Sequence, residues 1–482
     1  MTSNGRSLSV LHAATELFPW IKTGGLADVA AALPEALGTI GVDARLVIPG
    51  FPEVISALRD DRVVYEAQGL LGTSRMRLRL GSLPSRSTPI YVIDAPSLYA
   101  RPGSPYSHPY HGDWGDNLIR FAMLGWTAAR LAEGGLDPQW RPDLLHVHDW
   151  HPALALAYAA DSWPPVKSVL SIHNIDYQGR FPPDDFNRLG LPHWLCAPYG
   201  PLEFFGDLCF LKAGVVLAHK VTTVSPTYAR EVTAGQHGHG IDSVIRSRGD
   251  ALIGIVNGVD YSVWDPRNDD HLPARFGIDD LAGKARCKAA LRARVGLNDH
   301  GEAPIFVVVS RLGWQKGSDL IANAADDLVA RGAQLVVIGN GDRQIEERLQ
   351  ELQSRHGGMV AIRTEFLEPL AHLAIAGGDA LIMPSRQEPC GLTQMYAKRY
   401  GTLPLVNAVG GLADTVTAET GFRFLERESS LTTAIDHVLQ THQDRPRWMH
   451  MVSTAMLADH SWGKSAEAYR DVYLQILGHT PS

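Results

Sequence analysis

Short apolar segments alternate with longer helix-like segments along the whole chain, and this alternation limits the possible folds most strongly. The short segments are rich in β-branched residues and have the length of buried strands. Strands that alternate with helices in this way form parallel sheets covered by helices, so the sequence predicts an α/β fold. The predicted strands are Leu8–His12, Ala44–Ile48, Ile90–Ile93, Leu144–His148, Ser168–Ile172, Lys220–Val224, Ile253–Val256, Ile305–Val309, Leu335–Ile338, Ala380–Met383 and Leu403–Val406.

A change in composition divides the chain after its first half. The turn-rich stretch Asn257–Pro266 is followed by a polar segment and by the charged helix predicted at Lys284–Arg294. Further helices are predicted at Asp319–Ala330, Arg343–Arg355 and Leu392–Tyr400. A length of 482 residues fits two large domains or three smaller ones. We therefore expect two α/β domains that divide near residue 253.

Composition excludes several classes of protein. Hydrophobic residues make up 45% of the chain and charged residues 20%, which is typical of a soluble globular protein. The net charge of −8 predicts no general attraction to nucleic acid or to a membrane surface. The four cysteines form no CxxC pair, and we find neither a signal peptide nor a membrane-spanning segment. We expect a reduced, cytoplasmic protein.

A Gly-Gly-Leu-Ala-Asp sequence occurs twice, beginning at Gly24 and at Gly410, each time between a predicted strand and a predicted helix. Glycine and alanine are common here, so chance is one explanation. The other is a glycine-rich turn in each domain, with both turns facing one ligand, because ligands of open α/β sheets bind at the carboxyl ends of strands. We favour the second explanation.

Three cations precede predicted helices, where the helix dipole disfavours positive charge. Lys22 precedes the first Gly-Gly pair, and Arg311 and Lys316 follow the predicted strand Ile305–Val309. These residues are either solvated loop charges or ligands of a bound phosphate, which would reverse the electrostatic preference. A diphosphate suits the pair Arg311 and Lys316, since arginine binds phosphate through two donors and lysine as a point charge.

Glu388 lies in a loop between a predicted strand and a predicted helix, followed by Cys390, Gly391, Leu392 and Thr393. The amides of residues 391–393 can donate to an anion, and the carboxylate can bind sugar hydroxyls or stabilise positive charge. An exposed loop glutamate without function explains the pattern equally well.

Histidines gather at two predicted strand ends. His146, His148 and His151 have the density of a metal site, but no further ligand set stands nearby, so hydrogen bonding at the strand end is the preferred interpretation. His173 follows the next strand and can bind a substrate hydroxyl, although a structural histidine is the commoner case. Gly339-Asn-Gly341 lacks the third glycine of a dinucleotide fingerprint, which argues against a dehydrogenase.

Taken together and in order, these motifs resemble the bacterial glycogen synthase and plant starch synthase family, the ADP-glucose-dependent type, over nearly the full chain. The segments that carry the resemblance are Lys22-Thr-Gly-Gly-Leu-Ala-Asp-Val, His146-Val-His-Asp-Trp-His, His173-Asn-Ile-Asp-Tyr-Gln-Gly, Phe210-Leu-Lys-Ala-Gly, Val221-Thr-Thr-Val-Ser-Pro-Thr-Tyr-Ala-Arg-Glu, Val256-Asn-Gly-Val-Asp, Val309-Ser-Arg-Leu-Gly-Trp-Gln-Lys-Gly, Pro384–Gln394 and Tyr400-Gly-Thr-Leu-Pro-Leu-Val with the second Gly-Gly-Leu-Ala-Asp.

The resemblance implies a GT-B fold, in which two Rossmann-like domains face a deep inter-domain cleft. It implies an acceptor-side domain over residues 1–253, a nucleotide-sugar-binding domain over 254–462, and a final helix, about 463–482, that packs back on the first domain. The implied activity is a retaining transfer of glucose from ADP-glucose to the non-reducing end of an α-1,4-glucan, either glycogen or a maltooligosaccharide. No metal and no cofactor are implied, because protein cations neutralise the leaving diphosphate.

The family's site residues carry over onto this sequence. Arg311 and Lys316 would hold the ADP phosphates, Lys22 and Gly25 would complete that site, and the amides of Cys390, Gly391, Leu392 and Thr393 would add donors. The implied catalytic residues are Glu388 at the glucose ring, His173 near its 6-hydroxyl, and Asp28 near the reacting sugars. Asn257 would contact the donor sugar, and Phe366 would lie at the adenine.

Several positions in the donor-side half depart from the family pattern. Gln387 stands where phenylalanine is usual, Leu373 where arginine is usual, and Phe366 lacks the usual Gly-Tyr context. Asn407 replaces a residue that is often basic, and the loop from Val416 to Gly421 is short. These departures leave open a transferase that uses UDP-glucose or another acceptor. A weakly catalytic glucan-binding protein is the third alternative.

Overall fold

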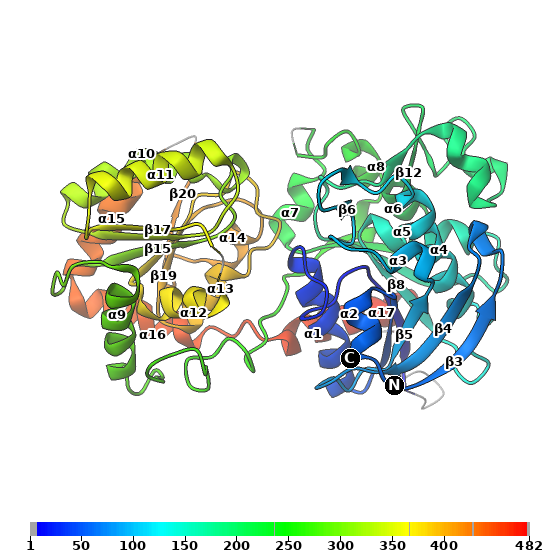
Figure 1. Cartoon of the computed structure of the whole chain (residues 1–482), viewed down its shortest axis with the longest axis horizontal. Coiled ribbons are helices and arrows are strands. Elements are labelled where there is room, and N and C mark those ends of the chain that lie inside the picture. Colours follow the sequence, from blue (N-terminus) through cyan, green and yellow to red (C-terminus); the bar gives the residue numbers. More distant parts are fainter. Residues whose placement is uncertain (1–6, 236, 366, 427–428, 480–482) are drawn as a thin grey trace. The chain divides into compact units, whose positions relative to one another are not determined.

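The chain divides into two units, each built around its own parallel sheet (Figure 1). The computed structural model describes residues 7–235, 237–365, 367–426 and 429–479. Unit 1 comprises Met1–Gly258 and Trp462–Ser482, and unit 2 comprises Val259–Ser461. The α/β class predicted from the sequence is confirmed. The domain limits expected at residues 253 and 462 stay predictions.

Unit 1 contains a nine-stranded sheet in the order β14-β13-β9-β8-β1-β2-β5-β4-β3. Its strands are parallel except β4 and β3, which pair antiparallel at one edge. The bounds are β1 (Ser9–Ala13), β2 (Asp43–Pro49), β3 (Arg59–Ala67), β4 (Met76–Ser82), β5 (Ile90–Asp94), β8 (Leu144–His148), β9 (Ser168–Ile172), β13 (Lys220–Thr223) and β14 (Leu252–Gly254).

The sequence analysis missed the antiparallel edge. β4 alternates apolar with charged residues, as in Met76-Arg-Leu-Arg-Leu, and β3 begins with four charged residues, Arg59–Arg62. Both strands therefore lack the continuous apolar run of a strand buried on both faces. Edge strands carry such charges because these discourage pairing with another chain.

The helices of unit 1 include one from each end of the chain. The last helix, α17, packs against α1, and both bury apolar side chains in a core with strands β1, β2 and β8. Tyr469 and Tyr473 of α17 are fully buried there. The helices are α1 (Gly25–Thr39), α2 (Pro52–Ala57), α3 (Pro96–Tyr99), α4 (Asn117–Ala132), α5 (Trp150–Tyr158), α6 (Phe210–Leu217), α7 (Pro226–Glu231), α8 (Asp242–Arg246) and α17 (Trp462–Ile476).

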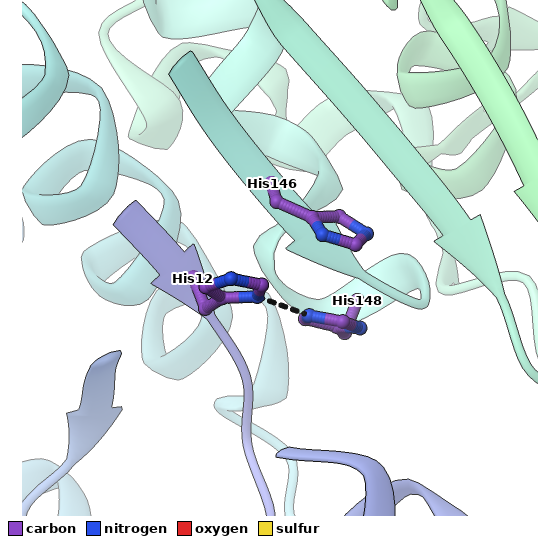
Figure 2. Close-up of side chains that lie close together, drawn as sticks. All are labelled: His12, His146 and His148. Atoms are coloured by element: carbon purple, nitrogen blue, oxygen red, sulfur yellow. Dashed lines mark hydrogen bonds between the residues drawn. The ribbon is translucent and has the colours of Figure 1, made fainter. Parts of the chain in front are cut away.

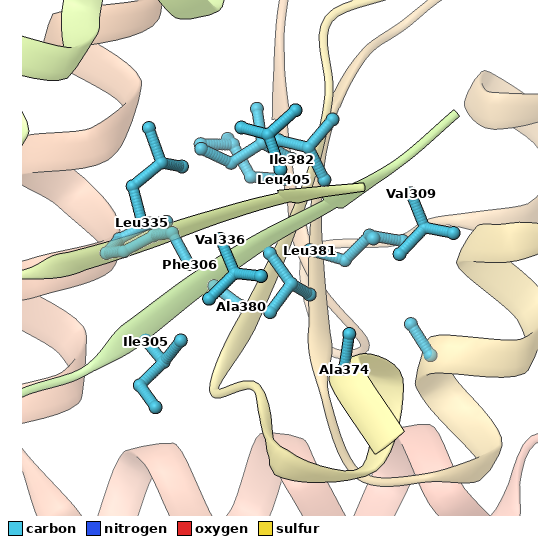
Figure 3. Packing of buried hydrophobic residues seen from close by; sticks show 14 of the residues in the cluster. Ile305, Phe306, Val309, Leu335, Val336, Ala374, Ala380, Leu381, Ile382 and Leu405 are labelled. Atoms are coloured by element: carbon cyan, nitrogen blue, oxygen red, sulfur yellow. The ribbon is translucent and has the colours of Figure 1, made fainter. Parts of the chain in front are cut away.

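Unit 2 contains a six-stranded parallel sheet in the order β17-β16-β15-β18-β19-β20. Apolar side chains cover both faces of its central strands, as Figure 3 shows for Phe306, Leu335 and Leu381. The bounds are β15 (Ile305–Val309), β16 (Gln334–Ile338), β17 (Val360–Arg363), β18 (Ala380–Met383), β19 (Leu403–Asn407) and β20 (Phe422–Phe424).

Helices follow the strands of unit 2 in alternation, which is the pattern that the sequence predicted. They are α9 (Ala282–Val295), α10 (Ser318–Ala330), α11 (Arg343–Arg355), α12 (Glu368–Gly377), α13 (Thr393–Arg399), α14 (Gly410–Thr415), α15 (Leu431–Gln443) and α16 (Arg445–Leu457). Within the described part of the chain, no helix has both the length and the apolar composition needed to cross a bilayer.

Replacement of Phe306 by alanine tests the core of unit 2. Phe306 is fully buried in β15, so Phe306→Ala should lower the free energy of unfolding of unit 2 by about 3–5 kcal/mol through lost burial and a cavity. Leu457→Ala is the control, because Leu457 lies in α16 of the same unit and is 70% exposed, and it should change stability by less than about 1 kcal/mol. Chemical denaturation followed by circular dichroism measures both, and equal effects would contradict the described packing.

Candidate active site

Each of the two large sheets has a point where the strand order reverses between two parallel strands, and most of the candidate site residues lie at these two points. In unit 2 the order reverses between β15 and β18, and in unit 1 between β1 and β8. Loops that follow the two strands at such a point diverge to opposite sides of the sheet, which leaves a crevice at the carboxyl edge where ligands of open α/β sheets bind.

In unit 2, a lysine and a glutamate meet at the reversal point. Lys316 Nζ lies 2.7 Å from Glu388 Oε2, and Ser385 Oγ donates to the same oxygen at 3.0 Å. Lys316 ends the short turn Trp314–Lys316 after β15, and Glu388 lies in the loop after β18. Glu388 is only 8% exposed, which excludes the interpretation as an exposed loop glutamate. We call Lys316, Ser385 and Glu388 the Lys316–Glu388 cluster.

Arg311 supplies a second cation in the loop after β15 that also carries Lys316. It lies two residues beyond β15 and its side chain is exposed. Among the described residues, its guanidinium has no hydrogen-bond or ion-pair partner. A cation with no partner among the described residues, in the same loop as Lys316, leaves positive charge available for an anion. That a phosphate binds here stays a prediction.

Arg386 links the loop after β15 to the loop after β18. Its guanidinium pairs with Asp319 in the first turn of α10 at 2.8 and 2.9 Å, donates to Trp314 O at 2.8 Å and contacts Glu426. Its backbone N–H also donates to Gln315 O at 2.8 Å. Sequence reasoning missed this role, because the partners of Arg386 are distant in the chain.

Gln387 takes part in the same loop contact. Gln315 Nε2 donates to Gln387 Oε1 at 3.2 Å. The residue that departs from the family's phenylalanine thus joins the two loops through side-chain amides. Asn407, another departure, bridges strand ends: its amide donates to Ser385 O at 3.0 Å and its oxygen accepts from Glu426 N at 3.2 Å.

The segment Cys390–Thr393 presents backbone donors beside Glu388. α13 begins at Thr393, one residue later than predicted. The amides of Gly391, Leu392 and Thr393 have no acceptor within the part of the chain that the structure describes. Gln394 fixes the loop, because its Nε2 donates to Cys390 O at 3.1 Å and to Gly391 O at 3.0 Å. Cys390 is buried, and within the described part of the chain it forms no disulfide.

The two Gly-Gly pairs differ in their surroundings. Gly410 has φ +44°, and a Cβ there would collide with the carbonyl oxygen of Glu388, while Gly411 N donates to Glu388 O at 3.0 Å. The second pair therefore holds the backbone of the glutamate loop. Gly24 and Gly25 are exposed, and a Cβ on either would meet nothing within 4 Å. Only the first pair leaves open space at the start of its helix.

In unit 1, Lys22 and Asp28 form an ion pair at the start of α1, 2.9 Å apart. A buried carboxylate holds the backbone of this turn: Glu16 accepts from Thr23 N at 2.6 Å and from Gly24 N at 3.0 Å, and Tyr106 Oη donates to it. Burial raises the pKa of Glu16. The sequence analysis missed Glu16, although a charged residue inside the apolar stretch after β1 was a usable signal.

Histidines from β1 and β8 pack together at the reversal point of unit 1 (Figure 2). His12 Nδ1 lies 3.1 Å from His148 Nε2, and His148 Nδ1 lies 3.1 Å from His173 Nε2. His146 bonds Tyr473 Oη and Ser171 Oγ, each at 2.7 Å. We call His12, His146, His148 and His173 the histidine cluster. His12 was missed, because its partners come from a strand far along the chain.

The histidine cluster fits hydrogen bonding better than metal binding. One nitrogen each from His12, His146 and His148 lies within 4.8 Å of the others, a spacing that a metal could bridge. However, both ring nitrogens of His146 and of His148 already have hydrogen-bond partners inside the protein. A metal would have to break these buried bonds, so we retain the hydrogen-bonding interpretation made from the sequence.

Asp149 orients the backbone that carries His173. Its Oδ1 accepts from His173 N at 2.7 Å, across from β8 to β9. Asp149 has φ +61° and ψ −170°, a strained backbone conformation that residues other than glycine rarely adopt. Burial raises its pKa from 3.8 to about 7, although the backbone donors oppose the shift.

The remaining predicted residues are separate from these clusters or outside the description. Asn257 lies in unit 1, not in unit 2, and is 5% exposed with no partner for its Oδ1 among the described residues. Leu373 is buried in α12. Phe366 lies outside the described residues, so its expected place at an adenine stays a prediction.

Comparison with known proteins identifies the neighbours of this chain. A model of the starch synthase catalytic domain matches residues 9–247, and one of the group 1 glycosyl transferases matches residues 292–450. The glycogen synthase of Francisella philomiragia is 42% identical, with 98% of this chain and 100% of the relative covered. The glycogen synthase of Francisella tularensis subsp. novicida is also 42% identical, with 98% and 99% covered.

Solved structures agree. The catalytic domain of starch synthase IV from Arabidopsis thaliana, bound to ADP and acarbose, matches with a TM-score of 0.86 at 29% identity, covering 98% of this chain and 100% of that one. Sucrose-phosphate synthase from Thermosynechococcus elongatus matches with a TM-score of 0.59 at 17% identity, covering 98% and 99%, and so shows the fold alone. These neighbours confirm the predicted GT-B class of fold.

Alanine substitutions test whether the two Gly-Gly pairs have different roles. Gly410→Ala should lower the thermal midpoint of unit 2 by several degrees, because the new Cβ meets the Glu388 carbonyl and the left-handed backbone costs about 1–2 kcal/mol. Gly24→Ala, the matched control, should leave the midpoint nearly unchanged. Differential scanning calorimetry distinguishes them, and an unperturbed Gly410→Ala variant would refute the proposed support of the glutamate loop.

Asp149→Asn tests the buried carboxyl. A folded-state pKa of about 7, above the unfolded value, means that the folded protein binds an extra proton between these values. The stability of the wild type relative to Asp149→Asn should therefore fall by up to about 4 kcal/mol as the pH rises from about 4 to about 7. Asp60→Asn is the control, since Asp60 is exposed with φ +51°. A difference in unfolding free energy between the wild type and Asp149→Asn that stayed the same at every pH would contradict the raised pKa.

Proposed function

Because the chain belongs to the glycogen synthase and starch synthase family of glycosyltransferases, we propose that it uses ADP-glucose to extend an α-1,4-glucan at its non-reducing end. Relatives at 42% identity over the full chain support glycogen synthase activity. The proposal that ADP-glucose is the donor goes beyond what the names of these relatives state. It rests on the resemblance of the motifs and on the related starch synthase, whose structure contains ADP and acarbose.

The contact between Lys316 and Glu388 carries the proposal. It places a cation that can take a leaving phosphate next to a carboxylate that can take a sugar ring, on neighbouring strand ends of one sheet. A glucosyl donor has both groups joined by one bond. As that bond breaks, negative charge grows on the phosphate and positive charge on the sugar, so groups of opposite sign stabilise both sides.

Protein cations take the place of a metal in this proposal. Arg311 has no protein partner among the described residues, and Lys316 is paired only with the cluster's own carboxylate and is one quarter exposed. The free amides of Gly391, Leu392 and Thr393 add neutral donors. Together these groups can neutralise a diphosphate, so we propose that transfer needs neither a metal nor another cofactor.

In this proposal, residues of unit 1 serve both the phosphates and the sugar. Lys22 would add a further cation for the phosphates beside the open Gly24–Gly25 turn, and Asp28 holds that lysine. Among the described residues, His173 Nδ1 and Asn257 Oδ1 are buried polar atoms without a hydrogen-bond partner. A sugar hydroxyl that reached either atom could supply that partner.

The donor assay tests the proposal directly. Purified protein is incubated with glycogen and radiolabelled ADP-glucose or UDP-glucose, and label in the polymer is counted with and without EDTA. We expect incorporation from ADP-glucose that EDTA does not change. Incorporation from UDP-glucose alone would contradict the donor, and loss of activity in EDTA would contradict metal-free transfer. Glycogen binding without turnover of either donor would favour the glucan-binding alternative.

Lys316→Ala tests the cation. Loss of a charged donor at the leaving group should lower kcat/KM for ADP-glucose by on the order of 100- to 1000-fold. Lys288→Ala is the matched control: Lys288 pairs with Asp379 at 2.8 Å in the same unit, but outside the Lys316–Glu388 cluster. That variant should retain kcat/KM within about threefold. Similar losses in both variants would mean that Lys316 acts only through stability.

A further inference from the structure

The loop that follows β15 is anchored at two places, and each anchorage carries one cation. Residues 310–312, which include Arg311, are bonded to the loop that follows β16. Residues 315–317, which include Lys316, contact the loop that follows β18. The two cations are therefore held by different neighbours, although they lie in one short loop.

At the first anchorage, pairing between β15 and β16 continues past the ends of both strands. Just before Arg311, Ser310 N donates to the last carbonyl of β16 at 3.2 Å. Just after it, Leu312 N donates to Asn340 O at 2.7 Å, and Leu312 O accepts from Asp342 N at 2.8 Å. These hydrogen bonds fix the backbone on both sides of Arg311.

Two glycines of the loop after β16 make this close approach possible. A Cβ on Gly339 would collide with Ser310 O, and a Cβ on Gly341 would collide with Leu312 O. A glycine in such a place marks a position where another backbone comes too close for a side chain. The Gly-Asn-Gly sequence, which lacks the third glycine of a dinucleotide fingerprint, thus packs directly against the residues that flank Arg311.

On its other side, β15 leaves β18 early. Pairing between β15 and β18 ends at Val307 and Leu381, whereas pairing between β15 and β16 continues to Val309 and Ile338. The segment that carries Arg311 then follows the loop after β16. It therefore stays on the β16 side of the point where the strand order reverses, which is where ligands of open α/β sheets bind.

At the second anchorage, the loop after β15 meets the loop after β18. Arg386 N donates to Gln315 O at 2.8 Å. Gly317, which follows Lys316, has φ +66°, and a Cβ there would collide with Pro384 O. The two anchorages share no residue, so the loops after two different strands set the separation of the two cations.

We propose that the turn Gly339–Gly341 is a positioning element that holds Arg311 at a fixed separation from Lys316, so that the two cations together select a nucleoside diphosphate over a nucleoside monophosphate. Two phosphates can engage both cations at once, whereas a single phosphate can be bound by either cation alone. The turn acts only through Arg311. This inference rests on the proposed function, in which these cations hold the leaving diphosphate.

Titration calorimetry with ADP and with AMP tests the turn. Gly341→Ala adds a Cβ that collides with Leu312 O, so the first anchorage must move and Arg311 with it. The dissociation constant should rise about tenfold or more for ADP, and less than about threefold for AMP. Loss of folded protein removes sites for both nucleotides alike and leaves the ratio of the constants unchanged. A ratio equal to that of the wild type would overturn the proposal.

Gly283→Ala is the matched control. Gly283 lies in α9 of the same unit, and a Cβ there would collide with Arg275 O, a conflict of the same kind as at Gly341. Gly283 belongs to neither anchorage. The variant should lose thermal stability as Gly341→Ala does, yet keep the wild-type ratio of the ADP and AMP constants. An equal change of the ratio in both variants would reduce the turn to a packing role and overturn the proposal.

A double-mutant cycle shows whether the turn acts through Arg311. Arg311→Ala alone should weaken ADP binding by about 10- to 100-fold, as expected for a lost charge-assisted hydrogen bond. In that background, Gly341→Ala should cost less than about a further twofold, because the group that it displaces is already gone. Losses that simply multiply would show that the turn affects binding by another route, against the proposal.

Glu346→Ala is a second variant that loosens the turn without adding a clash. Glu346 Oε1 accepts from Gly341 N at 2.6 Å, and the variant removes that acceptor. ADP binding should weaken by about two- to fivefold, with AMP binding nearly unchanged. Should Gly341→Ala not fold, this variant decides the question, and an unchanged ratio in it would overturn the proposal.

The nucleotide series separates this inference from the proposed function. If the wild type binds UDP and not ADP, the donor assignment fails, and the same variants titrated with UDP and UMP test the turn. If the wild type transfers glucose from ADP-glucose while Gly341→Ala keeps the ratio, the positioning role fails alone. A wild type that binds neither diphosphate more tightly than its monophosphate would overturn the inference itself.

Discussion

The order of strands in the two parallel sheets is the constraint on which both candidate sites depend. In a parallel sheet all carboxyl ends lie on one edge, and where the order reverses the two following loops part. In unit 2 the loops after β15 and β18 bring together Lys316 and Glu388, 72 residues apart in the chain. In unit 1 the reversal between β1 and β8 brings together His12 and His148.

The same arrangement of strands supports opposite electrostatics in the two units. Unit 2 gathers charges: a buried carboxylate, its lysine partner and an arginine without a protein partner among the described residues. A buried ion pair contributes little net stability, because desolvation offsets the attraction between the charges. A ligand that develops charge of both signs as its bond breaks better explains why this ion pair lies where the strand order reverses. Unit 1 instead buries neutral imidazoles, which form directional hydrogen bonds and contribute no charge.

The sequence predicted the elements buried on both faces and missed those whose stability comes from distant partners. The central strands of both sheets read as continuous apolar runs, and Ile305–Val309 was predicted with its observed bounds. β3 and β4 were missed because charged residues interrupt their apolar positions, at the start of β3 and at alternate residues of β4. Arg311, Lys316 and Glu388 followed from local position. Glu16, His12 and Arg386 did not, because their roles depend on hydrogen bonds to residues that only the fold brings near.

The central claim is that Glu388 serves the sugar and Lys316 the phosphate, although the two are paired without a ligand. Calorimetric titration of ADP into the wild type and into Glu388→Gln, with glucose transfer measured on the same samples, tests it most directly. Because the carboxylate competes for Lys316 and repels phosphate, Glu388→Gln should bind ADP at least as tightly as the wild type while transfer is lost. ADP binding that weakens in proportion to the loss of transfer would contradict this division of roles.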